Sequence, residues 1–505
     1  MTDRTVADHR GLDFEEPLLF EQGAPGRSGV DLPQKKDGEN RLGGLERQGE
    51  IGLPGLSEPQ VVRHFTRLSQ KNFGIDSGFY PLGSCTMKHN PRLNEKMARL
   101  PGFDNLHPLQ PTGTVQGALA LMDALADWLK ILTGLPAVAM SPAAGAQGEL
   151  CGMMAIRAAL VERGDPRRRV LVPESAHGTN PATAAALGYQ VDPVPGDARG
   201  RIDVNAFREK LGDDVAAVML TNPNTCGLFE DAILEVADAI HDIGGFLYAD
   251  GANFNAIVGR VRPADLGIDC MHINLHKTFS TPHGGGGPGS GPVVLSKELA
   301  PYAPYPFLVH GDQGFRLVEG PGPGQLAAGA KPFGRLKGFH GQMGMFVRAL
   351  TYMMSHGGDG LRRVAEDSVL SANYLLASLK ADLSVPFDGP CMHEALFDDR
   401  AFRVHGITTL DFAKALIDEG FNPMTIYFPL VVHGALLMEP TESESVDGLD
   451  HFIGTVKRLL EKLKSGDVAH FQEAPRLTPR RRLDETQAAR NPVLRWRPPV
   501  QAPKA

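Results

Sequence analysis

The chain has 505 residues, of which 42% are hydrophobic and 22% charged, and its formal net charge is −8. This length predicts two or more packed units with a core of normal size, and the acidic balance argues against a nucleic-acid-binding protein, which usually has a basic excess. Five scattered cysteines, none spaced as C-x-x-C, disfavour a disulfide framework or a zinc site and favour reduced thiols in a cytosol.

Residues 1–115 contain few periodic elements and many turn residues, and they predict an extended arm followed by loops. One helix is expected in SEPQVVRHFTRLSQKN, where Ser57 is placed to cap and Pro59 lies in the first turn. The start MTDRTVADHR lacks the apolar segment of a secretory signal, and no apolar run is long enough to cross a bilayer. We therefore expect a soluble, cytoplasmic protein.

Residues 116–345 predict the large domain of an α/β fold. Helices are expected over TVQGALALMDALADWLKILTG, after the loop SPAAGAQGE as far as Val161, and from about Glu230 to His241. Short apolar runs alternate with them at 170–173, 189–194, 216–223, 245–253, 271–277 and 291–296. This alternation predicts a mostly parallel central sheet with flanking helices, with ligands at the carboxyl ends of the strands.

Residues 346–470 predict a long helical stretch and a smaller C-terminal α/β domain, and residues 471–505 form an extension rich in Arg and Pro. From Ala474 onward the extension carries seven arginines and Lys504 against two acids, Asp484 and Glu485. We favour an arm that lies across a partner chain, with Trp496 as an apolar anchor. Plain disorder is the alternative.

Lys277 lies at the end of an apolar run and enters the loop NLHKTFSTPHGGGGPGSGP. Gly284 to Gly287, Gly289 and Gly291 allow positive φ and a close backbone approach to a ligand. The loop is not a nucleotide loop, because G-x-x-x-x-G-K-[ST] is absent. A lysine at a strand end facing a cleft suits a Schiff base with an aldehyde cofactor, although most lysines are solvated surface groups.

Asp250 ends the apolar run FLYADGAN, 27 positions before Lys277. Burial of an unpaired carboxylate there would be costly. Pairing with the protonated pyridine nitrogen of pyridoxal phosphate removes that cost and keeps the ring an electron sink. An Asp that caps the turn before Gly251 is the alternative for Asp250 alone. Together, Asp250 and Lys277 predict a pyridoxal-phosphate enzyme with the cofactor on Lys277.

The loop SPAAGAQGE opens a predicted helix, whose free N–H groups and dipole suit a phosphate. Gly145, Ala146 and Gln147 are the candidate phosphate ligands, and an ordinary helix start is the alternative.

His177 in SAHGTNPA is placed to stack on the pyridine face, or else is an ordinary polar loop histidine. Thr179, Asn222 and Asn224 are placed to contact the ring hydroxyl or to position His177, and turn formation is the alternative for them. His276, beside Lys277, is also expected to bind the cofactor.

A resemblance extends over almost the whole chain, from residue 17 to residue 499. It rests on the strings YPLGSCTMKHNP, HPLQP, SPAAGAQGE, SAHGTNPATAAALG, TNPNTCGLFE, YADGANFNAIVG, NLHKTFSTPHGGGGPGSGP and EPTESES, in this order. These motifs resemble the glycine cleavage system P-protein, glycine dehydrogenase (decarboxylating), and more narrowly subunit 2 of its split bacterial form. His89 and Ser290 depart from the family pattern, and neither belongs to the cofactor set.

The resemblance implies fold type I of pyridoxal-phosphate enzymes, with catalytic residues Lys277, His177 and Asp250. It implies glycine as substrate, release of CO2 and transfer of the aminomethyl group to the lipoyl arm of the H-protein. It also implies a homologous subunit 1 in an α2β2 heterotetramer. No bound metal is expected.

The string YPLGSCTMKHNP, residues 80–91, would be a substrate-side loop. Ser84, Cys85 and Thr86 suit a glycine carboxylate and Lys88 would supply charge, while a buried packing thiol is preferred over a redox role for Cys85. Further candidates come from HPLQP and EPTESES: His107, Gln110, Glu439, Thr441 and Glu442. The last three are expected to close the site from the small domain, unless they form a solvated acidic turn.

Two other functions compete with this interpretation. Another fold type I decarboxylase or an aminotransferase is the first, but no arginine can be placed for the second carboxylate that an aminotransferase substrate carries. A cofactor-free structural subunit is the second, and Lys277, Asp250 and His177 argue against it.

Overall fold

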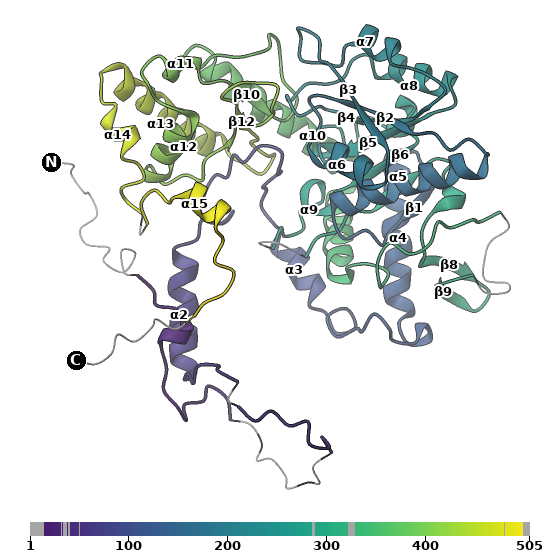
Figure 1. The fold of residues 1–505 in the computed structure, drawn as a ribbon, viewed down its shortest axis with the longest axis horizontal. Helices are drawn as coiled ribbons and strands as arrows, with labels where there is room; N and C mark the ends of the chain where they lie inside the picture. The colour runs from purple at the N-terminus through teal and green to yellow at the C-terminus, as the bar shows by residue number, and fades with distance from the viewer. Residues whose placement is uncertain are drawn as a thin grey trace.

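The computed structural model describes residues 15–31, 33, 38, 41–49, 51–284, 288–321, 329–478 and 480–497. Gly285 to Gly287 of the predicted glycine loop and residues 498–505 of the extension lie outside the described residues. Figure 1 shows a large body around one sheet and a smaller body around β10 and β12, with helix α2 projecting away from both. No helix in the described part of the chain has the length and apolar character needed to cross a membrane.

A seven-stranded sheet forms the centre of the large body. Its strands are β1 (Ala137–Ala139), β2 (Arg169–Pro173), β3 (Gln190–Val194), β4 (Val215–Thr221), β5 (Phe246–Gly251), β6 (Cys270–Ile273) and β7 (Val293–Leu295). Their order is β1-β7-β6-β5-β4-β2-β3. Strands β3, β2, β4, β5 and β6 are parallel, whereas β7 runs antiparallel to both β6 and β1. The predicted mostly parallel α/β sheet is therefore confirmed.

Helices connect the strands and cover both faces of the sheet (Figure 1). They are α4 (Gln116–Thr133), α5 (Gly145–Glu162), α6 (Thr179–Ala186), α7 (Val204–Glu209), α8 (Ile233–Asp242) and α9 (Leu275–Thr278). The prediction of one strand over 271–277 is wrong at its end. Pairing with β5 ends at Ile273, and the N–H of Lys277 donates to the carbonyl of Asn274 at 3.1 Å, so Lys277 lies in a helical turn.

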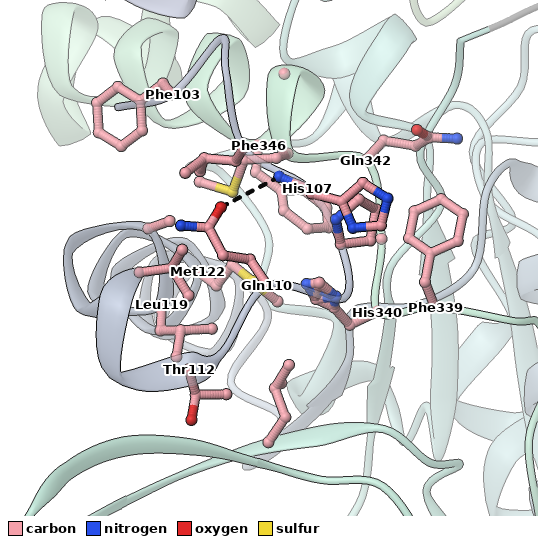
Figure 2. A pocket seen from close by; sticks show the side chains of 18 of the residues that line it. Phe103, His107, Gln110, Thr112, Leu119, Met122, Phe339, His340, Gln342 and Phe346 are labelled. Atoms are coloured by element: carbon pink, nitrogen blue, oxygen red, sulfur yellow. Dashed lines mark hydrogen bonds between the residues drawn. The ribbon is translucent and has the colours of Figure 1, made fainter. Parts of the chain in front are cut away.

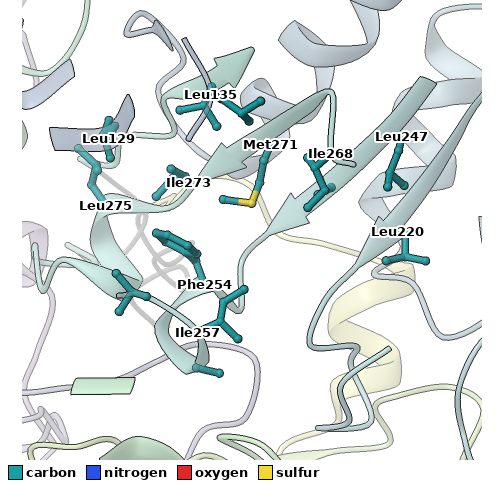
Figure 3. Packing of buried hydrophobic residues seen from close by; sticks show 14 of the residues in the cluster. Leu129, Leu135, Leu220, Leu247, Phe254, Ile257, Ile268, Met271, Ile273 and Leu275 are labelled. Carbon is teal, nitrogen blue, oxygen red and sulfur yellow. The ribbon is translucent and has the colours of Figure 1, made fainter. Parts of the chain in front are cut away.

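The main core packs on one face of this sheet (Figure 3). Leu220 of β4, Leu247 of β5 and Met271 of β6 are at most 3% exposed and belong to the same cluster as Leu129 of α4. Each fully buried aliphatic side chain of this kind stabilises the fold by roughly 1.5–3 kcal/mol.

Helix α5 lies close against β5 and β6. A Cβ atom at Gly148 would come within 2.6 Å of the His272 Cβ, and one at Gly152 within 2.7 Å of the Tyr248 ring. The two glycines permit this approach, which brings the first turn of α5 to the carboxyl edge of the sheet.

Helix α10 (Met343–Leu379) joins the two bodies and bends at Gly357, where φ is +63°. Phe346 and Met353 pack in the core of the large body, whereas Leu375 and Leu379 pack in that of the small one. The division at residues 345 and 346 remains a prediction, since α10 contributes to both cores.

The small body contains an antiparallel sheet of order β10-β12-β11, with helices against it. Its strands are β10 (Ala395–Phe397), β11 (Thr425–Ile426) and β12 (Leu436–Met438). Its helices are α11 (Arg400–Arg403), α12 (Thr409–Asp418), α13 (Val446–Lys464) and α14 (Ala469–Gln472). A hairpin of β8 (Phe307–Gly311) and β9 (Gly314–Val318) and the helix α3 (Arg92–Ala98) belong to the large body.

Helix α2 (Glu58–Gln70) begins after Ser57, with Pro59 in its first turn as predicted. Its residues His64 and Arg67 hold the N-terminal segment, because the buried Glu16 carboxylate lies 2.9 Å from His64 Nδ1 and accepts from Arg67. In the extension, α15 (Glu485–Arg490) precedes Trp496, whose ring stacks on Phe20 with centroids 5.0 Å apart. The two ends of the described chain therefore meet beside α2, and we call α2 with these two end segments the projecting arm.

Candidate active site

A cavity of about 200 Å3 lies at the carboxyl ends of β4, β5 and β6. Its wall is made by side chains and backbone from many parts of the sequence: Ser84, Gly145, Ala146, Glu149, His177, Thr179, Thr221, Thr225, Asp250, Ala252, Asn253, His272, Asn274, His276 and Lys277. Eight of the predicted site residues meet here, namely Ser84, Gly145, Ala146, His177, Thr179, Asp250, His276 and Lys277.

Lys277 reaches the cavity from α9, one helical turn beyond the end of β6. Its Nζ donates a hydrogen bond of 2.7 Å to the backbone carbonyl of Ser84. Ser84 and Thr86 have left-handed backbone conformations, with φ of +63° and +45°, which are uncommon for residues other than glycine. The substrate-side loop is thus folded into a strained turn directly above the lysine.

Asp250 is the last residue but one of β5 and is 3% exposed. Its Oδ1 accepts from the N–H of Ala252 at 2.9 Å and lies 3.3 Å from His272 Nε2, while its Oδ2 accepts weakly from Asn180 at 3.4 Å. Burial lowers the pKa of His272, so the imidazole is neutral. The buried carboxylate therefore has no cationic partner among the described residues, and a protonated pyridine nitrogen would provide one.

Glu149 and His272 line the same cavity and were missed in the sequence analysis. Burial and the charge of Asp250 raise the pKa of Glu149 to about 9, so its carboxyl group is protonated at neutral pH. The hydroxyl of Tyr248 lies 2.6 Å from His272 Nδ1 and fixes the ring behind Asp250. Two signals in the sequence could have identified them. Glu149 is an acidic residue near the start of α5, and His272 is a polar residue inside the apolar strand β6.

His177 lies at the mouth of the cavity and is exposed. The hydroxyl of Thr179 is 2.9 Å from His177 Nδ1, and the ring meets Phe428 edge-on at a centroid distance of 5.8 Å. The imidazole is therefore oriented by Thr179, one of the two arrangements anticipated for that threonine.

Three buried polar atoms on the cavity wall have no hydrogen-bond partner within the described chain: Thr221 Oγ1, Asn274 Oδ1 and His276 Nδ1. Gly145 and Ala146 begin α5, where first-turn N–H groups have no helical acceptor. A ring with a hydroxyl group and a phosphate would supply partners for both sets. On these grounds the residues fit pyridoxal phosphate.

Gln147 and Asn222, both predicted to bind the cofactor, are not on the wall. The Oε1 of Gln147 accepts from the N–H of Ala143 at 2.8 Å and so caps its own loop. The Oδ1 of Asn222 accepts from the N–H of Glu230 at 3.0 Å. Asn224 forms a turn, as its alternative proposed, since its side chain accepts from the N–H of Cys226.

Lys88, predicted to supply charge to the substrate, does not line this cavity. Its ammonium is buried and donates to Glu442 at 2.7 Å, to the carbonyl of Thr278 at 2.8 Å and to Asn255 at 2.9 Å. It also lies 4.9 Å from the centre of the Tyr352 ring. Lys88 instead ties the substrate-side loop to α9 and to the small body.

Cys85 and Thr86 are likewise absent from the wall, although they directly follow Ser84 in the sequence. Burial raises the pKa of Cys85 to about 11, which disfavours a reactive thiolate and agrees with a packing thiol. The backbone N–H groups of both residues donate to Glu439 of the small body.

Gln110 and His107 lie in a separate cavity of about 330 Å3 between α4 and the start of α10. Figure 2 shows them beside Met122, His340 and Phe346, with the N–H of His107 donating to Gln110 Oε1 at 3.4 Å. This placement separates Gln110 from the wall around Lys277.

Comparisons with known proteins identify the family. A family model described as glycine dehydrogenase, C-terminal domain, matches residues 364–477, and one for class-V aminotransferases matches residues 148–298. A protein of Caulobacter vibrioides named probable glycine dehydrogenase (decarboxylating) subunit 2 is 62% identical over 504 residues, which cover 99% of this chain and 96% of that protein. The chain belongs to the glycine dehydrogenase (decarboxylating) subunit 2 family.

Other members of the subunit 2 family align with equal completeness. A protein of Listeria monocytogenes with the same name is 48% identical over 497 residues, which cover 97% of this chain and 100% of that protein. The predicted family is therefore confirmed.

Solved structures support the fold. A crystal structure of glycine decarboxylase (P-protein) of the glycine cleavage system, in inhibitor-bound form, aligns with a TM-score of 0.69 and 23% identity, over 83% of this chain and 93% of that one. A NifS-like protein aligns with a TM-score of 0.58 and 14% identity, over 76% of this chain and 99% of that one. The predicted fold type I architecture of the subunit 2 family is confirmed.

Proposed function

We propose that this chain decarboxylates glycine with pyridoxal phosphate and transfers the remaining aminomethyl group to the lipoyl arm of the H-protein, with release of CO2. One observation carries the proposal: Lys277, Asp250 and the first turn of α5 line one cavity at the carboxyl edge of the sheet. The full-length identity to proteins named glycine dehydrogenase (decarboxylating) subunit 2 supports glycine as the substrate.

Pyridoxal phosphate, when bound, supplies an electron sink joined to the substrate amine. Lys277 would hold it covalently, Asp250 would pair with its ring nitrogen, and Gly145 and Ala146 would bind its phosphate. His177, oriented by Thr179, would lie over the ring from the mouth of the cavity.

The chain's own residues prepare this cavity in three ways. The carbonyl of Ser84 accepts a hydrogen bond from the Lys277 amine and holds this amine at the cavity, where it would be placed to carry a proton. His272 is neutral and Glu149 is protonated, so neither of these neighbours neutralises the Asp250 carboxylate, which stays available to pair with a cation. The buried wall restricts water around the reacting carbon.

The proposed partners are a homologous subunit 1, in an α2β2 assembly, and the lipoylated H-protein. Exposed apolar side chains gather on the projecting arm, where Val62 and Phe65 of α2 are 56% and 53% exposed. Together with the Phe20–Trp496 stack, they support this arm as a surface for subunit 1. The five free cysteines support a reducing cytoplasm as its compartment.

The function is tested by exchange of labelled bicarbonate into the carboxyl group of glycine. The assay is run on this chain, on a subunit 1 homologue and on their mixture, each with lipoylated H-protein and pyridoxal phosphate. We expect exchange in the mixture. Amino transfer to an oxo acid without any exchange would contradict the proposal and favour an aminotransferase.

A further inference from the structure

A second buried polar cluster lies in the small body, outside the cavity that holds Lys277. It contains His393, Glu394 and Glu439, which are at most 1% exposed. Strand β10 pairs with β12 so that Ala395 faces Met438, and this register places Glu394 and Glu439 at one end of the pair. The mechanism proposed above uses none of these three residues.

The two carboxyl groups hold three consecutive backbone N–H groups of the substrate-side loop. Glu394 Oε1 accepts from the N–H of Ser84. Glu439 Oε2 accepts from Cys85 at 3.1 Å and from Thr86 at 2.9 Å. These are hydrogen bonds between segments more than 300 residues apart, and all of them end on the turn that carries the Ser84 carbonyl.

Other contacts join the same loop to the small body. The hydroxyl of Thr425 donates to the carbonyl of Gly83 at 2.7 Å, Leu82 forms a β-bridge with Met438, and the N–H of Glu439 donates to the carbonyl of Pro81 at 3.2 Å. These contacts fix residues 81–86 of the loop to the small body, while Ser84 also contacts Lys277 of the large one.

The three side chains of the cluster lie close together, with one polar atom of each within 4.8 Å of the others. Burial and the neighbouring Glu439 raise the pKa of Glu394 well above its ordinary value, which favours its protonated form. Burial lowers the pKa of His393, whose Nε2 lies 3.8 Å from Glu439 Oε1 and 3.9 Å from Glu394 Oε2.

We propose that Glu394 and Glu439 are positioning residues, which hold the Ser84–Thr86 turn in its left-handed conformation so that the Ser84 carbonyl binds the Lys277 amine. They thereby couple the position of the small body to the lysine. What Lys277 does rests on the proposed function, but the contact between loop and lysine does not.

The test uses the full chain, co-expressed with a subunit 1 homologue and freed of cofactor. Amide hydrogen exchange is measured for the peptide that covers residues 84–86, and the modification rate of Lys277 by an amine-reactive acylating reagent is measured by mass spectrometry. The variants are Glu439→Ala, Glu439→Gln and Glu394→Ala. Glu230→Gln serves as control, because Glu230 is equally buried and also accepts a backbone N–H, that of Ile202, at a distance from the loop.

We expect Glu394→Ala, which removes one hydrogen bond, to speed exchange at 84–86 by about tenfold, and Glu439→Ala, which removes two, to speed it by at least as much. Lys277 should be acylated several-fold faster, because its amine is no longer held by the Ser84 carbonyl and is more accessible to the reagent. Glu439→Gln keeps one acceptor oxygen and should stay near wild type, as should Glu230→Gln.

Unchanged exchange at 84–86 and unchanged acylation in the alanine variants would overturn the inference. Faster exchange throughout the chain, including α5, would also overturn it, since the residues would then serve general stability. A wild-type chain that binds no pyridoxal phosphate would refute the proposed function and leave these results interpretable.

Discussion

The side chain of Lys277 and the backbone carbonyl of Ser84 are 193 residues apart in the sequence and 2.7 Å apart in the structure. This hydrogen bond joins the lysine of the large body to a loop held by the small one. The candidate site is therefore composite, and mutations far from the cavity are expected to affect the lysine.

The role of Asp250 predicts that Asp250→Asn still binds pyridoxal phosphate but loses glycine–bicarbonate exchange by a factor of about 100 or more. The neutral amide cannot keep a proton on the ring nitrogen, so the electron sink is weakened. Asp269→Asn is the control, because Asp269 is also buried and precedes β6 at the opposite edge of the sheet. Exchange at the wild-type rate in Asp250→Asn would refute the pairing.

The buried ion pair of Lys88 and Glu442 predicts a loss of stability when either partner is removed. Lys88→Met should lower the free energy of unfolding by about 3 kcal/mol, because an uncompensated charge and several buried acceptors remain. Urea unfolding of Lys88→Met, Glu442→Leu and the double variant measures this, and the double variant should recover part of the loss. Unchanged stability combined with lost glycine binding would restore the substrate role first expected for Lys88.

The pKa of Glu149, raised to about 9 from the ordinary value of 4.5, predicts a pH dependence of stability. The folded chain free of cofactor binds this proton more tightly than the unfolded chain does. The stabilisation is therefore fully present below pH 4.5 and is lost as pH rises through about 9.

The side chain in Glu149→Gln does not titrate. As pH increases from 6 to 9, the thermal midpoint of this variant should therefore rise relative to that of wild type. The trend should be smaller in an Asp250→Asn background, because the Asp250 charge contributes to the raised pKa. Parallel curves for Glu149→Gln and wild type would show that Glu149 is ionised.

If the projecting arm is the surface for subunit 1, removal of residues 484–505 should weaken co-purification with that subunit, because it removes Trp496 from the arm. Truncation at residue 474 would be uninformative, because Arg482 donates to the carbonyls of Ala474 and Phe471 and pairs with Asp411 at 2.7 Å. Trp496→Ala in the full-length chain tests the stack on Phe20 alone. Undiminished association of both variants would exclude a role for the extension in assembly.

The sequence predicted those parts of the site that depend on a single strand or helix. Asp250 lies at the end of β5 and Lys277 follows β6, and the carboxyl ends of such parallel strands meet at one edge. The first turn of α5 was predicted because the small residues of SPAAGAQGE open a helix, whereas the strand before this loop, β1, was not among the predicted strands.

The individual partners in the contacts between the two bodies were not predictable, although EPTESES was expected to close the site from the small domain. Lys88 was expected to bind substrate because it is a cation in a polar loop. Its partners in the structure, Glu442 and Tyr352, come from remote segments that the local sequence does not indicate. Glu394 and Glu439 could be assigned to the substrate-side loop only after the β10–β12 register was known. Neither the periodicity of hydrophobic residues nor the residue types in turns indicates contacts between segments so far apart in the sequence.

The central claim is that Lys277 holds pyridoxal phosphate, and borohydride reduction of the loaded chain tests it most directly. Lys297→Ala, which changes an exposed lysine beyond β7, is the control. After reduction and proteolysis, we expect the cofactor on the peptide containing Lys277 in wild type and Lys297→Ala, and neither label nor visible absorbance of a bound cofactor in Lys277→Ala. Full visible absorbance in Lys277→Ala, with the reduced cofactor on another lysine, would contradict the account.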